Sequence, residues 1–125
     1  MKFLCLICAE KVMEQMPPAD ATRHFADYAQ FTAAIRDSGQ LVACNRLLPP
    51  ATATTVRVRD GKISTIDGPY AETKEQLGGF YIIDAANRDE AVAIAARIPG
   101  ASIGCVEVRP MADDEATRRA LEPSA

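Results

Sequence analysis

The chain is organised around the stretch at residues 67–84, which reads DGPYAETKEQLGGFYIID. Its first three residues favour a turn, because glycine accepts positive φ, proline fixes its own φ, and an aspartate side chain can bond to nearby backbone. Residues 80–83 form the apolar run of a buried strand, and the glycines at 78–79 let another backbone approach closely. The polar residues between this turn and this strand are held at both ends. They form either an ordinary surface loop or the rim of a binding site.

A β-hairpin is expected immediately before this stretch. Residues 54–59 alternate between apolar and polar side chains, and Asp60-Gly61 is a strong signal for a two-residue turn. With that turn Val58 faces Ile63, so the apolar pair lies on one face of the hairpin and the neighbouring cationic pair lies on the other. The register and the hydrophobic pattern agree, which predicts a hairpin whose second strand covers residues 62–66.

The remaining segments predict an α+β fold with the order βαββαβ. Apolar runs indicate strands, and apolar residues at helical spacing indicate two helices that cover one face of an antiparallel sheet. The other face is left uncovered, so we expect it to meet a second copy in a two-fold dimer. The expected strands are 3–9, 41–48, 80–85 and 103–109, and the expected helices are 20–38 and 87–98.

Composition and length favour one domain. The chain has 125 residues, 48% of them hydrophobic, which is enough for a real core. Its net charge of −3 comes without a basic cluster, so neither nucleic acid nor an anionic membrane is expected as a partner. The apolar run in residues 1–9 is far too short to span a bilayer and fits a buried strand better than a signal peptide. Residues 1–111 are expected to form the domain, and residues 112–125 a peripheral helix or tail.

The four cysteines do not indicate a metal site. Cys5 and Cys8 lie three apart in the expected first strand, where the side-chain period of two sends them to opposite faces. With Cys44 and Cys105, they are interpreted as reduced, mostly buried thiols of a cytoplasmic protein. No phosphate-binding loop, dinucleotide motif or nucleophile elbow is found, so no metal and no cofactor are expected.

Residues 67–84, with 53–62 before them and 106–110 after them, closely resemble the DGPF branch of the YCII-related proteins. The resemblance covers residues 1–111 and departs from the usual motif mainly at Tyr70, where the family typically has phenylalanine. It implies a ferredoxin-like α+β domain that pairs through its sheets into a dimeric α+β barrel, with a cleft between the first helix and the sheet. Related barrels include small-molecule isomerases and cofactor-free monooxygenases, and relatives of this branch are often encoded beside extracytoplasmic-function sigma factors.

His24 is the first candidate catalytic residue. Asp20 and Asp27 lie one helical turn before and after it, and a carboxylate partner could fix the tautomer of the imidazole and leave its other nitrogen free to move a proton near pH 7. YCII-related proteins are thought to use a histidine and an aspartate, and His24 resembles that histidine in its place on the first helix. The structural alternative is a histidine that packs at the helix edge.

The motif supplies the other candidates. Asp67 is placed at the rim of the cleft as a hydrogen-bond or proton acceptor, beside Tyr70 and Glu72, with Lys74 positioned to meet an anionic group. Arg109 on the last strand is either an inward polar residue or an exposed one. The structural alternative for the loop is a tight turn with solvated or paired charges.

Two functions follow from these candidates. The first is a small cofactor-independent enzyme that transfers a proton on an organic substrate, with His24 as acid or base and Asp67 nearby. The second is a non-catalytic dimeric module that binds a small molecule or a regulatory protein such as a sigma factor. A concave pocket at His24 would favour the first function.

Overall fold

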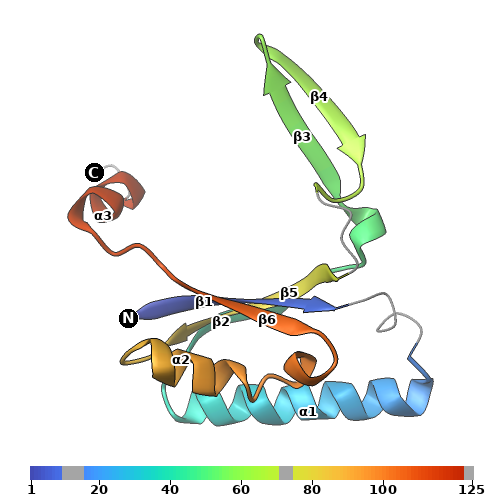
Figure 1. Cartoon of the computed structure of the whole chain (residues 1–125), viewed down its shortest axis with the longest axis vertical. Helices are drawn as coiled ribbons and strands as arrows, with labels where there is room; N and C mark the ends of the chain where they lie inside the picture. Colours follow the sequence, from blue (N-terminus) through green and yellow to red (C-terminus); the bar gives the residue numbers. More distant parts are fainter. Residues whose placement is uncertain (10–15, 71–74, 123–125) are drawn as a thin grey trace.

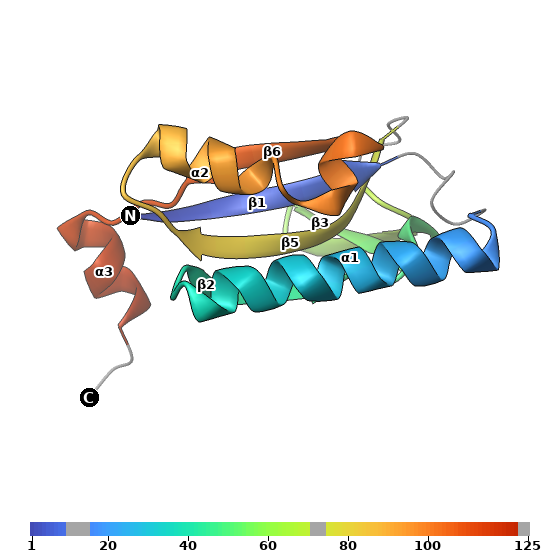
Figure 2. The same ribbon diagram turned by 90° about the horizontal axis from the view of Figure 1, so that it is seen from below.

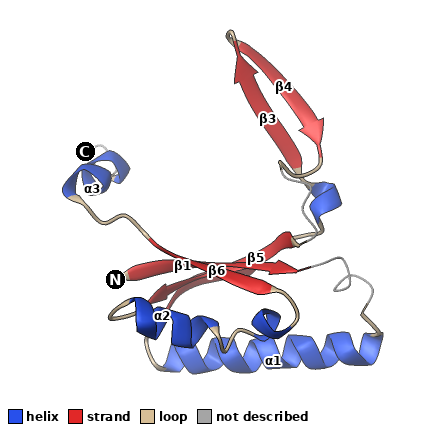
Figure 3. Cartoon of the chain, viewed as in Figure 1, coloured by secondary structure: helices blue, strands red, loops and turns tan. Residues whose placement is uncertain are grey.

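The computed structural model places nine strands and helices in the part of the chain that it describes, which is residues 1–9, 16–70 and 75–122 (Figures 1 and 3). No helix within these ranges is both long enough and apolar enough to span a bilayer. The elements are β1 (Lys2–Ala9), α1 (Pro18–Asp37), β2 (Leu41–Arg46), β3 (Thr54–Arg59), β4 (Lys62–Asp67), β5 (Gln76–Asp84), α2 (Arg88–Ala95), β6 (Cys105–Pro110) and α3 (Glu115–Leu121), with short 3₁₀ turns at Pro50–Thr52 and Pro99–Ser102.

Four strands form one sheet in the order β2-β5-β1-β6, and every neighbouring pair is antiparallel. The two long connections carry α1 and α2, which pack on the same face of this sheet (Figures 1 and 2). This arrangement confirms the predicted ferredoxin-like α+β fold.

The core lies between this sheet and the two helices. Alternation along β1 turns Phe3, Cys5 and Ile7 toward the helices, as the period of two requires. Apolar residues at helical spacing on α1 and α2 supply much of the rest of this core, but Phe25 of α1 is 56% exposed. The residues that complete the core are Phe31, Ile35, Tyr81, Ile83, Ala85, Ala91, Ile94, Ala95 and Ile98.

The predicted hairpin is confirmed. Val58 pairs with Ile63 in its register, and both turn residues have positive φ, 52° at Asp60 and 73° at Gly61, which is the pattern of a type I′ turn. The hairpin forms a separate two-stranded sheet that projects away from the main sheet on the side opposite α1 and α2, as does α3 (Figure 1). None of the residues of α3 is buried.

Several strands begin or end at other residues than predicted, because the neighbouring strand determines how far each one stays paired. β5 begins at Gln76 rather than at residue 80, since its first residues pair with Ala9 and Cys8 beyond an irregularity in the register. β2 ends at Arg46, before the apolar residues 47–48. At the start of α2 the side chain of Asn87 accepts a hydrogen bond of 2.9 Å from the backbone N–H of Glu90 and so caps the helix.

The prediction that the cysteines are mostly buried is wrong. All four are free thiols, but only Cys5 is buried, Cys8 and Cys44 are partly exposed, and Cys105 is exposed. The reason is the open face of the sheet: Cys8 and Cys105 point away from the helices, and no described element covers them.

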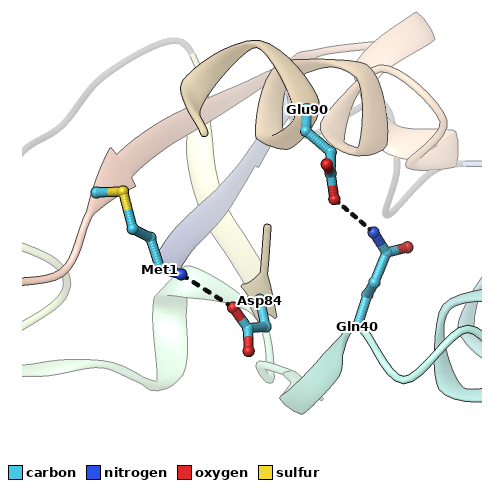
Figure 4. Close-up of polar contacts among 4 residues, drawn as sticks. All are labelled: Met1, Gln40, Asp84 and Glu90. Carbon is cyan, nitrogen blue, oxygen red and sulfur yellow. Dashed lines mark hydrogen bonds and ion pairs between the residues drawn. The ribbon is translucent and has the colours of Figure 1, made fainter. Parts of the chain in front are cut away.

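Two polar contacts tie the end of the sheet that lies near α2 (Figure 4). The ammonium group of Met1 bonds to Asp84 Oδ1 at 3.1 Å, across the β1–β5 pair. The side-chain amide of Gln40, just before β2, donates to Glu90 Oε1 on α2 at 2.9 Å. The Met1–Asp84 ion pair is exposed, so we expect it to contribute less than about 1 kcal/mol to stability.

Candidate functional site

A cavity of about 560 Å³ lies between the N-terminal half of α1 and the sheet, where β1, β2 and β5 run toward the hairpin. This is an ordinary size for a small-molecule site, and most of the lining is apolar, as such sites usually are. Among the described residues, the lining side chains able to form strong hydrogen bonds are His24, Tyr28, Asn45, Arg46, Gln76 and Tyr81.

His24 lines this cavity and also a second, more open hollow that contains Asp27. Its ring meets the ring of Tyr28 edge to face, with centroids 4.9 Å apart. The Nε2 atom is shielded from water and has no hydrogen-bond partner among the described residues, so neither Asp20 nor Asp27 pairs with it. Asp20 instead lies 3.9 Å from Arg23. A buried polar atom without a partner costs about 1–3 kcal/mol, and such atoms call for an explanation.

The ring of Tyr28, which contacts His24, lies parallel to the ring of Tyr81, and the centroids of the two tyrosine rings are 6.5 Å apart. The hydroxyl of Tyr28 accepts a hydrogen bond of 3.1 Å from the backbone N–H of Gly100, and the hydroxyl of Tyr81 lies 2.7 Å from that of Thr32. Burial raises the pKa of Tyr28 to about 12 and also raises the pKa of Tyr81. Both hydroxyls therefore stay protonated at neutral pH and can act as donors.

Arg46 supplies the one full positive charge among the described lining residues, and none of these residues is an aspartate or a glutamate. Its guanidinium lies 5.4 Å from the centroid of the Phe25 ring. Such a cation–π contact holds the group without neutralising it. The contact also gives Phe25 a role although its side chain is largely outside the core. The charge of this cavity favours an anionic ligand.

Two candidates from the first part of the motif, Asp67 and Tyr70, lie elsewhere on the described chain, although residues 76–81 of the same stretch line the cavity. Asp67 is the last residue of β4, pairs with Thr54 and is exposed. Tyr70 is 82% exposed, and its ring lies 5.7 Å from the guanidinium carbon of Arg57. Neither residue lines the cavity that contains His24. Glu72 and Lys74 lie outside the described residues, so their role stays a prediction, as does that of Asp67.

Arg109 is exposed and forms an ion pair of 3.1 Å with Glu107 on the same strand. Both side chains lie on the sheet face away from the helices, and neither contributes to the cavity. Sequence reasoning missed Arg46 and Tyr81 as cavity residues. A weak signal was present for Arg46, which with Asn45 interrupts the apolar segment 41–48, but the sequence around Tyr81 is that of an ordinary buried strand.

Comparisons with known proteins place the chain in a family. Residues 1–113 match the model of the YCII-related domain. An uncharacterised protein of Rhizobium meliloti (strain 1021) is 47% identical to the chain over 78 residues, which are 61% of this chain and 63% of that relative. The chain thus spans somewhat less than two thirds of the length of the relative it matches. The family match covers all six strands and both core helices, and the chain belongs to the YCII-related family.

Proposed function

We propose that this protein is a small-molecule enzyme that moves a proton on an organic anion bound in the cavity between α1 and the sheet, with His24 as the acid and base. One observation carries the proposal: the imidazole of His24 borders a largely apolar cavity, and its buried Nε2 has no hydrogen-bond partner in the part of the chain that the structure describes. A histidine that only packs would lose stability through that nitrogen, whereas a substrate could bond to it.

The chemistry that fits these groups is an isomerisation. His24 takes a proton from a carbon next to a carbonyl, the C–H electron pair forms an enolate, and the same proton returns to another carbon of the substrate. In this proposal the hydroxyl of Tyr28 donates a hydrogen bond to the enolate oxygen and keeps its proton, while its own oxygen accepts the Gly100 N–H. Since Nε2 is shielded, we expect small side-chain shifts when substrate binds.

The lining also supports a class of substrate. Apolar side chains from β1, α1, β5 and the segment after β2 line the cavity, and the guanidinium of Arg46 lies against the ring of Phe25. A keto acid with an apolar body, such as an aryl or branched-chain keto acid, would bury its body against these side chains and pair its carboxylate with the guanidinium, and its ketone would supply the carbonyl that the reaction needs.

The first test compares ligands that differ only in charge. Benzoate and phenylacetate are expected to raise the melting temperature of the protein, and their neutral amides are expected to bind roughly 10-fold to 100-fold more weakly, because a charge-assisted hydrogen bond contributes about 1.5–3 kcal/mol. Titration calorimetry gives both affinities. Arg46→Met should remove the preference for the anions.

Arg36→Met is the matched control, because Arg36 lies on the last turn of α1, is exposed and does not line the cavity. Equal affinities for acid and amide in the wild-type protein would refute the anion site. Tight binding of acids with no turnover of any of them would instead favour the competing function, a non-catalytic module that binds a ligand or a sigma factor.

We also infer that the protein is a homodimer that pairs through its sheet faces. The face opposite the helices presents Leu4, Leu6, Phe80 and Ile82 at its centre, and both the hairpin and α3 project from that side (Figure 1). The hairpin alone leaves Ile63 75% exposed, and an isolated two-stranded sheet is marginally stable at best. A second copy would cover the sheet face and contact these arms.

Light scattering at micromolar concentration is expected to give the mass of two chains. Leu6→Glu should convert the protein to monomers, because it places a charge at the centre of the apolar face. Val92→Glu on the exposed side of α2 is the control and should stay dimeric. A monomeric wild-type protein would contradict the inference, and circular dichroism must show that both variants remain folded.

A further inference from the structure

Two thiols on the open face of the sheet lie directly opposite each other. Cys8 near the end of β1 pairs in register with Cys105, the first residue of β6. Their side chains point away from the helices and are close enough to hydrogen-bond to each other. Neither thiol lines the cavity described above, so the proposed function does not use them.

The pairing pattern gives the separation of the two backbones. Met111 donates its backbone N–H to the carbonyl of Lys2 at 2.9 Å, which makes this end of the β1–β6 ladder a hydrogen-bonded pair. Hydrogen-bonded and non-hydrogen-bonded pairs alternate along an antiparallel ladder, so every second pair from Lys2–Met111 onward is hydrogen-bonded, and Cys8–Cys105 is one of these. In such pairs the Cα atoms are about 5.5 Å apart, a separation that disulfides commonly bridge.

The other cysteines have no such partner. Cys5 lies on the opposite face of β1 and is buried. Cys44 shares that face, but β5 stands between β2 and β1, so the Cα atoms of Cys5 and Cys44 are roughly 10 Å apart. That separation is too long for a disulfide. Within one chain, the fold therefore brings together one pair of thiols out of the four.

We propose that Cys8 and Cys105 form a reversible intramolecular disulfide when the protein meets a peroxide. The bond would join the edge strand β6 to the central strand β1. Cys105 is exposed in the single chain and begins the edge strand β6, so it lies at the margin of the face that the proposed dimer covers, where an oxidant has access. Exposed disulfides are generally the ones that cellular thiols can reduce again.

The order of the two steps follows from the contacts of Cys105. Its thiol donates a hydrogen bond of 2.8 Å to Glu75 Oε2, and this carboxylate, followed by burial, raises the pKa of Cys105 to about 11. Burial, followed by the charges of Glu107 and Glu75, also raises the pKa of Cys8, but it is the proton of Cys105 that a carboxylate holds by a hydrogen bond. We therefore expect Cys8 to react first: its thiolate sulfur attacks the O–O bond of hydrogen peroxide, becomes sulfenic acid and releases hydroxide. Cys105 then attacks the Cys8 sulfur, and its proton leaves with the sulfenic hydroxyl as water. Two thiols lose two electrons and the peroxide gains them.

Treatment of the full chain with hydrogen peroxide, followed by alkylation of the remaining thiols and digestion without reductant, tests the proposal. Mass spectrometry is expected to find a Cys8–Cys105 linked peptide, with Cys5 and Cys44 alkylated. The count of free thiols in the unfolded protein should fall from four to two and return to four with dithiothreitol. Cys105→Ser should leave a sulfenic acid on Cys8 that dimedone traps, and the control Cys44→Ser should form the same disulfide as wild type.

Three outcomes would overturn the proposal. They are four free thiols after peroxide treatment, a disulfide that joins two chains, or oxidation of Cys105 to sulfonic acid without a link to Cys8. Because Cys105→Ser and Cys44→Ser change a single sulfur atom to oxygen, both variants should fold, and a thermal melt verifies this. None of these readouts depends on turnover of a substrate, so they test the disulfide independently of the proposed enzyme activity.

Discussion

A Gly104→Ala substitution is expected to destabilise the protein by about 2–4 kcal/mol and to lower its melting temperature by roughly 10 °C. A β-carbon added at Gly104 would lie 2.1 Å from the carbonyl oxygen of Cys8 and 2.9 Å from Cα of Ala9. These are backbone atoms of the central strand, so they cannot rotate out of the way. Relief requires β6 to move from β1, which breaks hydrogen bonds of the ladder. Denaturant unfolding followed by circular dichroism measures the loss.

Gly78→Ala is the matched control for this prediction. A β-carbon at Gly78 would have its nearest neighbour at 3.9 Å, an ordinary contact, and Gly78 is also in a strand. We expect it to be neutral or to stabilise the protein by up to about 1 kcal/mol, because alanine restricts the unfolded chain. Equal stability of the two variants would show that β6 does not approach β1 as closely as described.

His24→Ala is expected to lower kcat by about 10²-fold to 10⁴-fold on a substrate found among the apolar acids, since that is the usual contribution of a general acid or base. Added imidazole should restore part of the rate, because it can enter the space left by the ring and accept the same proton. Rescue of this kind separates proton transfer from packing. Steady-state kinetics with and without imidazole measure it.

Stability provides the second readout for His24. If the histidine only packs at the helix edge, the variant should melt earlier and turn substrate over at the wild-type rate. If Nε2 serves the reaction, it has no partner among the described residues in the free protein and costs folding free energy. Removing it relieves that cost, so the melting temperature should change little. Tyr28→Phe is a useful companion, because it keeps the ring that packs on His24 and removes the hydroxyl proposed to donate to the substrate.

Local rules made the fold predictable from the sequence. The hairpin register followed from Asp60-Gly61, because both turn positions need positive φ and only a few residues tolerate it. The second helix began where Asn87 could cap it. Alternation along β1 placed Cys5 and Cys8 on opposite faces. Each of these features depends on residues within a few positions of one another.

The candidate site was less predictable, because its residues come from distant parts of the chain. His24 was identified through its chemistry and does border the cavity, but Asp67, Tyr70 and Arg109 lie elsewhere on the described surface. Those three were chosen because they belong to the motif or to the last strand. A sequence motif can reflect the requirements of a turn as well as those of a ligand site. Arg46 carried almost no sequence signal.

The sequence by itself determined the order of strands and helices, the hairpin, the caps and the family. Only the tertiary structure decided that Arg46 and Tyr81 join His24 at one cavity, and that Cys8 meets Cys105 beside Glu75. The physical reason is that local propensities act over one or two helical turns, or over one or two residue pairs of a hairpin. Which side chains share a cavity depends instead on how α1 lies across the sheet and on which strand pairs with β1, and these are set by the packing of the whole core.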